Sequence, residues 1–165
     1  MTKKVQKICL ALALLLTILC ISFIFSNSLK NSAESSEQSS AVRDFLLSLA
    51  SLFGIDADIN VTKLRNFAHV AEFLALGVSL SSLLLFLLRK KGVLTTLRLY
   101  TALSLGIIIG LLIAVSDELI QLFSEGRACD VKDVMLDSIG ILFGTLVVLI
   151  VYLIRRRIKF VINKK

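Results

Sequence analysis

The sequence predicts an all-α integral membrane protein, a four-transmembrane-helix bundle with a short amphipathic helix in the first extracytoplasmic loop. Three observations lead to this fold class. The first is composition, since the 165 residues are 56% hydrophobic and include no proline. A mean hydropathy of +0.88 is too apolar for an ordinary soluble domain. The second observation is a set of four long apolar runs, and the third is the separation of basic from acidic residues along the chain.

The four apolar runs are each about 20 residues long, which is enough to cross a bilayer. They cover residues 5–25, 67–88, 99–123 and 134–154. The first run follows basic residues, as a signal peptide would. Its apolar core is longer than the roughly 7–15 residues of a signal core, so we predict an uncleaved helix. The chain is then one membrane domain over residues 1–165.

The charges predict how the spans are oriented. Lys and Arg gather before the first span, between the second and third spans, and in a basic tail at residues 155–165, and these segments contain no Asp or Glu. The positive-inside rule therefore places both termini in the cytoplasm. Although the net charge is +7, topology and lipid headgroups explain the basic face. We predict the lipid bilayer as a partner and no binding to nucleic acid.

The first outer loop, residues 26–66, has two parts. The stretch "SNSLKNSAESSEQSS" is polar and serine-rich, and we expect it to be mobile. The stretch that follows predicts an amphipathic helix over about 41–53, because Val42, Phe45, Leu46, Leu49 and Phe53 recur at helical spacing. This helix would lie on the outer membrane surface or cover the bundle mouth as a lid. Burial of its apolar face against the other helices is an equal alternative.

Ten polar side chains gather near the predicted outer ends of three spans. They are Arg65, His69 and Glu72 on one face of the second span, Asp117, Glu118 and Gln121 on the third, Arg127 in the following loop, and Asp130, Asp133 and Asp137 along a stripe that leads into the fourth. Ionisable groups within a span cost several kcal/mol unless they pair or face a wet cavity, so they are functional candidates. The glycine pairs Gly106–Gly110 and Gly140–Gly144 would let the same helices approach closely.

Two longer segments carry these residues, "RNFAHVAEFLALG" and "SDELIQLFSEGRACDVKDVMLDSIGILFG". They resemble the two signatures of the VanZ-like family, and the likeness covers roughly residues 8–153. The second segment has the acidic pair, the Gln, the Arg of a "GR" turn, the spaced aspartates and two glycines. The resemblance implies a small helical protein of the bacterial plasma membrane. It also implies a link to the cell envelope and to low-level resistance to the glycopeptide teicoplanin. It implies no settled reaction, and the cofactors stay unknown.

The leading hypothesis is a polar pocket that acts on a lipid or lipid-linked cell-wall molecule at the outer leaflet. The candidate catalytic residues are His69, Glu72, Asp117 and Glu118, because imidazole and carboxylate groups can move protons. The candidate binding residues are Arg65, Gln121, Arg127, Asp130, Asp133 and Asp137. A hard divalent cation could also be held by nitrogen and oxygen ligands from His69, Glu72, Asp117, Glu118, Asp133 and Asp137. No spacing of the HExxH kind supports it, so the sequence assigns no metal ligand.

Three other readings of the same residues stay open. A non-catalytic binder or shield would engage or mask a cationic drug, a lipid headgroup or a partner protein without turnover. A lipid-linked cell-wall precursor or a glycopeptide is the predicted partner of the pocket. A small transporter is a second alternative, for which the chain would need to form a homodimer, because four spans are few. In the third, the acids and arginines form a buried ion-pair network that fixes helix packing.

Overall fold

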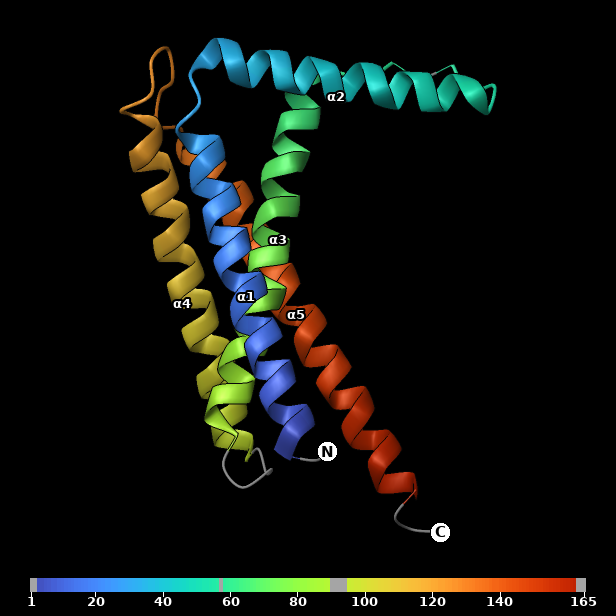
Figure 1. The fold of residues 1–165 in the computed structure, drawn as a ribbon, viewed down its shortest axis with the longest axis vertical. Helices are drawn as coiled ribbons and strands as arrows, with labels where there is room; N and C mark the ends of the chain where they lie inside the picture. Colours follow the sequence, from blue (N-terminus) through green and yellow to red (C-terminus); the bar gives the residue numbers. More distant parts are fainter. Residues whose placement is uncertain (1–2, 57, 90–94, 163–165) are drawn as a thin grey trace.

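The computed structural model describes residues 3–56, 58–89 and 95–162, and these residues form five helices and no strands. The helices are α1 (Lys3–Ser28), α2 (Ser32–Leu52), α3 (Val61–Leu88), α4 (Thr96–Gln121) and α5 (Val131–Ile162). Helices α1, α3, α4 and α5 form a bundle, and α2 lies across one end of it (Figure 1). These four bundle helices are long and apolar enough to cross a membrane. The predicted fold class, a helical membrane protein with four spans, is confirmed.

Helix α3 begins earlier than its predicted span because a polar residue caps its first turn. Asn60 begins α3, because its side chain accepts hydrogen bonds from the backbone N–H groups of Thr62 at 2.9 Å and Lys63 at 3.3 Å. Side-chain acceptors at this position satisfy N–H groups that have no partner inside the helix. Four of the predicted inner basic residues, Lys90, Lys91, Lys164 and Lys165, lie outside the described residues.

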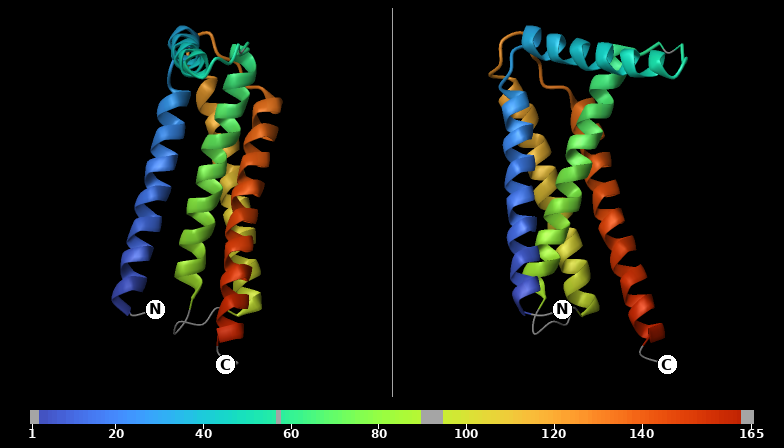
Figure 2. Two further views of the ribbon diagram at one scale, coloured as in Figure 1. Left: turned by 90° about the vertical axis from the view of Figure 1, so that its right-hand side faces the viewer. Right: turned by 45° about the vertical axis from the view of Figure 1, so that its right-hand side comes forward.

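The bundle has two distinct ends (Figure 2). The start of α1, the end of α3, the start of α4 and the end of α5 lie at one end, which we call the terminal end. Helix α2 and the loop between α4 and α5 lie at the other, which we call the α2 end. Chain topology therefore brings the end of α1, the start of α3, the end of α4 and the start of α5 together at the α2 end, where most of the ten polar residues occur.

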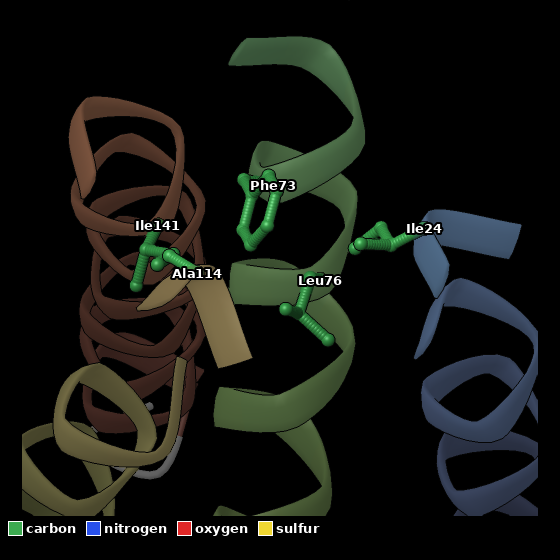
Figure 3. Close-up of a cluster of buried hydrophobic side chains, with 5 residues drawn as sticks. All are labelled: Ile24, Phe73, Leu76, Ala114 and Ile141. Atoms are coloured by element: carbon green, nitrogen blue, oxygen red, sulfur yellow. The ribbon is translucent and has the colours of Figure 1, made fainter. Parts of the chain in front are cut away.

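Helix α3 lies at the centre of the packing and contacts α5 most extensively. A cluster of buried apolar side chains from all four bundle helices fills the middle, namely Ile24, Phe73, Leu76, Ala114 and Ile141 (Figure 3). Glycines let α3 and α5 touch backbone to backbone. A Cβ atom added at Gly140 would lie 2.5 Å from the carbonyl oxygen of Val70, and one added at Gly77 would lie 2.6 Å from that of Ile141. The predicted role of Gly140 in close helix packing therefore has a direct physical basis.

Helix α2 begins earlier than the sequence pattern predicts. A capping box starts it, in which the Asn31 side chain accepts from the Glu34 N–H at 2.9 Å and the Glu34 carboxylate accepts from the Asn31 N–H at 3.1 Å. The serine-rich stretch is therefore helical as far back as Ser32. Helix α2 contains no fully buried residue. Its distal half extends past α3 (Figure 1), with Phe45 and Leu52 exposed.

Candidate functional site

The α2 end of the bundle contains a cluster of buried polar side chains. Asp117 and Glu118 are 2% and 1% exposed, Gln121 is 1% exposed, and Asp137 is completely buried. Charged residues are almost never this buried unless they have partners. The hydrogen bonds and ion pairs of these side chains therefore determine the geometry of the site.

Helices α3 and α5 bring His69 and Asp137 together. The Nδ1 atom of His69 lies 3.2 Å from Oδ1 of Asp137, and the imidazole is 12% exposed. The second carboxylate oxygen of Asp137, Oδ2, is buried and has no hydrogen-bond partner among the described residues. A carboxylate beside one ring nitrogen fixes the tautomer of a histidine and leaves the other nitrogen for chemistry or for a ligand.

Asp117 accepts hydrogen bonds from α1 and from its own helix, α4. The hydroxyl of Ser28 donates a hydrogen bond to Oδ1 of Asp117. The amide nitrogen of Gln121 donates to Asp117 at 3.0 Å and also to Glu118 at 2.9 Å. One glutamine therefore joins two neighbouring carboxylates and offsets part of their mutual repulsion.

Glu118 has a different environment from Asp117. Its Oε2 atom accepts a hydrogen bond of 2.9 Å from the backbone N–H of Asp130, just before α5. Asp130 itself is exposed and caps α5, because its side chain accepts from the Lys132 N–H at 2.9 Å. Glu118 therefore joins the end of α4 to the start of α5.

The α4–α5 loop is tied to the junction of α1 and α2. The Ser124 hydroxyl donates to the Ser28 carbonyl at 2.7 Å, and the Ser32 N–H donates to the Glu125 carbonyl at 3.0 Å. Gly126 has a φ of +72°, a conformation that favours glycine, and it lets the loop turn tightly beside Ser32. The guanidinium of Arg127 then points back to α1 and donates to the Asn27 carbonyl at 3.1 Å.

The two predicted cationic residues have different partners. Arg65 lies 3.9 Å from the carboxylate of Asp133 and is 43% exposed. Arg127 is half-buried, and burial together with the nearby Arg65 lowers the pKa of its guanidinium, while Asp117 and Glu118 oppose that shift. Because arginine titrates so far above neutral pH, the group keeps its charge. Of the two cations, only Arg65 approaches a carboxylate within ion-pair distance among the described contacts, and Arg127 bonds to a backbone carbonyl.

A cavity of about 350 Å³ lies beneath α2, between α1, α3 and α4. Its roof is the polar first half of α2, through residues such as Gln38 and Ser39. The polar side chains in its walls include six of the ten predicted site residues, namely Arg65, His69, Glu72, Asp117, Gln121 and Arg127. The other four, Glu118, Asp130, Asp133 and Asp137, are not among the lining residues that are described.

An apolar groove adjoins the cavity on the bundle side, between α1 and α3. Its walls include Leu16, Leu19 and Phe23. The groove and the cavity share Ile24, Ala71 and Glu72 as lining residues, so the two spaces are neighbours. Glu72 lies at this boundary, half-buried, and its carboxylate accepts a hydrogen bond of 3.1 Å from the side chain of Asn27.

The sequence patterns did not predict the contribution of α1. The side chains of Asn27 and Ser28 donate hydrogen bonds to Glu72 and Asp117, respectively. The backbone carbonyls of the same two residues accept from Arg127 and Ser124. The available signal was the polar run "SNS" that directly follows the apolar core of the first span. Polar residues at a span end are so common that this run alone does not distinguish a site residue from an interfacial one.

The fold and the buried acids define a class of protein, a small helical membrane protein with a polar site at one end of its bundle. The chain belongs to the VanZ/LLP1 family, whose model matches residues 12–153. This match confirms the predicted family and spans both segments on which the resemblance rested. Neither the curated proteins nor the solved structures include a significant match to this chain.

Proposed function

We propose that the cavity binds the headgroup of a lipid or lipid-linked cell-wall molecule in the outer leaflet of a bacterial plasma membrane. The observation that carries this proposal is that the cavity, with its charged side chains, and the apolar groove share Ile24, Ala71 and Glu72 as lining residues. An amphiphile requires these two environments side by side, because its headgroup needs polar partners and its chain needs apolar surface. The groove would receive the first part of the hydrocarbon chain.

The cations favour a phosphate-bearing headgroup. Arg65 and Arg127 both line the cavity, and guanidinium groups recognise phosphate oxygens through paired, charge-assisted hydrogen bonds. The acids that also line it would bind hydroxyl or amine groups of the same headgroup. Lipid phosphates and lipid-linked cell-wall precursors share this chemistry.

Proton transfer on the bound headgroup is the reaction that these residues support best. His69 can donate through Nδ1 to Asp137, which leaves Nε2 as the basic nitrogen. Glu72 and Asp117 lie in the same cavity wall. Glu118 is bonded to Gln121 and to the α4–α5 junction, so we assign it a positioning role and keep the catalytic role for the lining groups.

We propose further that the α2 end faces the outside of the cell. The basic residues at the other end support this orientation through the positive-inside rule. A headgroup site at the outer leaflet would lie where cell-wall precursors and glycopeptides such as teicoplanin meet. A change in teicoplanin susceptibility would then be a consequence of altered lipids or precursors.

The test compares whole-cell lipids and cell-wall precursors by mass spectrometry. Matched cells produce the wild type, Glu72→Gln or Asp117→Asn, and membrane levels of the protein are confirmed to be equal. Both changes keep the size of the side chain and its hydrogen-bond acceptor and remove the carboxylate. The control is Glu37→Gln, which removes an exposed carboxylate from α2.

We expect the abundance of at least one lipid or precursor to be the same in cells with the wild type and with Glu37→Gln. Its abundance should differ from these in cells with either of the two cavity variants. Equal profiles in all four strains would reject the catalytic proposal. If the profiles are equal but a phospholipid or precursor copurifies with the wild type and not with Glu72→Gln, the protein is a binder or shield without turnover.

A further inference from the structure

We infer that His69, Asp117 and Asp137 form a binding site for a divalent transition-metal ion such as Zn²⁺ or Mn²⁺. Each side chain offers one ligand atom, and these three atoms lie within 4.8 Å of one another. They come from three different helices, α3, α4 and α5, so the bundle itself creates the arrangement. The sequence showed no metal-binding spacing because the ligands are far apart along the chain.

The separation of the three atoms is close to that of a coordination sphere. Ligand bonds to zinc from histidine and carboxylate are about 2.0–2.2 Å long, so two ligands of one ion lie at most about 4.4 Å apart. Small side-chain rotations would therefore bring the three atoms onto one ion. Imidazole nitrogen suits zinc and iron, and carboxylate oxygen suits manganese and magnesium. A mixed set of one imidazole and two carboxylates favours Zn²⁺ or Mn²⁺ among these ions.

The second observation is the unpartnered oxygen of Asp137. Its Oδ2 atom is buried and has no hydrogen-bond partner among the described residues, although the side chain is 0% exposed. The Oε1 atom of Gln121 is a second buried acceptor without a described partner in the same cluster. A bound cation would give Oδ2 of Asp137 the partner that it lacks.

The charge balance of the site leads to the same conclusion. Asp117, Glu118 and Asp137 are buried, and Glu72 is half-buried beside them. Arg127 is half-buried, but its nearest described bond is to a backbone carbonyl. Arg65 is already paired with Asp133. Buried carboxylates that outnumber their cations are strongly unfavourable, and a divalent ion would restore the balance.

The site would enclose a metal ion on the side of the helix interface and leave it accessible from the cavity. Asp137 lies in the helix interface, whereas His69 and Asp117 line the cavity. Three protein ligands leave at least one coordination position open, as in catalytic rather than structural zinc sites. That position would face the space where we place the headgroup. Because His69 and Asp117 would bind the ion, proton transfer would then fall to Glu72 instead of His69. The metal inference does not depend on the identity of the headgroup.

The test is metal binding to the purified full-length protein in detergent. The protein is stripped with a chelator, and Zn²⁺ or Mn²⁺ is added. Bound metal is measured by mass spectrometry after desalting, and Mn²⁺ is also followed by electron paramagnetic resonance. The variants are His69→Gln, Asp137→Asn and Asp117→Asn. The control is Glu118→Gln, an equally buried carboxylate of the cluster that is not one of the three ligands and whose Oε2 atom bonds to the Asp130 N–H.

We expect the wild type and Glu118→Gln to retain one ion per chain and each ligand variant to bind more than about tenfold more weakly. Size-exclusion profiles show which variants fold, and any one folded ligand variant suffices for the comparison. Wild-type protein that binds neither ion, or binds no more than His69→Gln, would overturn the inference. Equal loss in Glu118→Gln would also overturn it, because binding would then belong to the acidic cluster as a whole.

The two proposals can fail separately. Stoichiometric metal binding with unchanged cellular lipids would support the site and reject the lipid function. A lipid change that depends on Glu72, in a protein that binds no metal, would do the reverse.

Discussion

The two ends of the bundle use different chemistry to hold the same helices together. At the α2 end, α3, α4 and α5 meet through buried carboxylates, a histidine and a glutamine. Toward the terminal end, they meet through apolar and small residues, including the buried cluster of Leu99, Leu103 and Val148. The main polar contact described there is a hydrogen bond of 3.0 Å between the hydroxyls of Ser81 and Thr145.

This difference explains how a small bundle can hold several acids in fixed positions. The close backbone contacts at Gly140 and Gly77 begin within one or two turns of Asp137 and Glu72. Because these contacts leave little room for helices to shift, they fix the distance between acids on neighbouring helices. The apolar side chains pack the helices together, and the polar end keeps groups that cost stability. Such an arrangement is typical of functional sites.

The largest expected effect comes from disrupting the glycine contacts. An added side chain at Gly144 would collide with the backbone carbonyl of Leu74, and backbone atoms cannot move aside as side chains can. We expect Gly144→Leu to destabilise the protein by at least about 3 kcal/mol, the upper part of the range for overpacked cores. The measurement is the yield and melting temperature of monodisperse protein in detergent.

The control for that change is Ser104→Leu. Ser104 is exposed on α4, so the same small-to-large substitution meets no neighbouring helix and should leave the melting temperature close to that of the wild type. A Gly144→Leu protein that is as stable as Ser104→Leu would mean that the helices can separate easily. The acids at the α2 end would then not be fixed by the glycine contacts.

A smaller loss of stability is expected at the polar end from Gln121→Leu. The change removes the donor that Asp117 and Glu118 share, and each buried acceptor left without a partner costs about 1–3 kcal/mol. Each carboxylate keeps a second partner, Ser28 for Asp117 and the Asp130 N–H for Glu118, so we expect a total loss of about 1–3 kcal/mol and a smaller fall in melting temperature than in Gly144→Leu. Ser116→Ala, which removes a bond between an exposed hydroxyl and its own helix, serves as the control and should have little effect. If Gln121→Leu loses more stability than Gly144→Leu, the polar contacts contribute more to the stability of the bundle than the glycine contacts do.

Much of the fold follows from the sequence because hydropathy and charge are local signals. The four spans, the polar end and the shared face of His69 and Glu72 can all be found from residue types and spacing. The start of α2 could not be found in this way, because a serine-rich run predicts no regular structure by its composition. Only the reciprocal bonds between Asn31 and Glu34 show that the helix begins there.

The internal organisation of the site was less accessible to sequence reasoning. Asp117 and Glu118 are neighbours in the chain, yet Asp117 lines the cavity and Glu118 joins α4 to the start of α5. That distinction depends on where the loop places the Asp130 N–H, which no spacing rule provides. Gly77 gave no GxxxG signal but makes one of the closest contacts to α5. Tertiary contacts of this kind are decided by the rotation of one helix against another.

The orientation of the two ends can be tested with the native cysteines. Cys129 is exposed in the α4–α5 loop, whereas Cys9 and Cys20 are half-buried in α1. We expect a membrane-impermeant maleimide to label wild-type protein in intact cells and to leave Cys129→Ser unlabelled. In the Cys129→Ser background, Thr96→Cys marks the terminal end and should react only after the membrane is broken. The opposite pattern would place the polar site on the cytoplasmic side and exclude an outer-leaflet substrate.

The smallest perturbation tests whether α2 contacts lipid. The chain contains no tryptophan, so Phe45→Trp introduces a single tryptophan on the exposed apolar side of α2, where Phe45 is 62% exposed. If this side rests in the headgroup region, its emission should be blue-shifted and quenched by lipids that carry a shallow spin label. Ser36→Trp, on an exposed position of the same helix, should emit as in water. Identical, water-like spectra would mean that α2 stands clear of the membrane, and the cavity beneath it would then open to the aqueous side rather than to lipid.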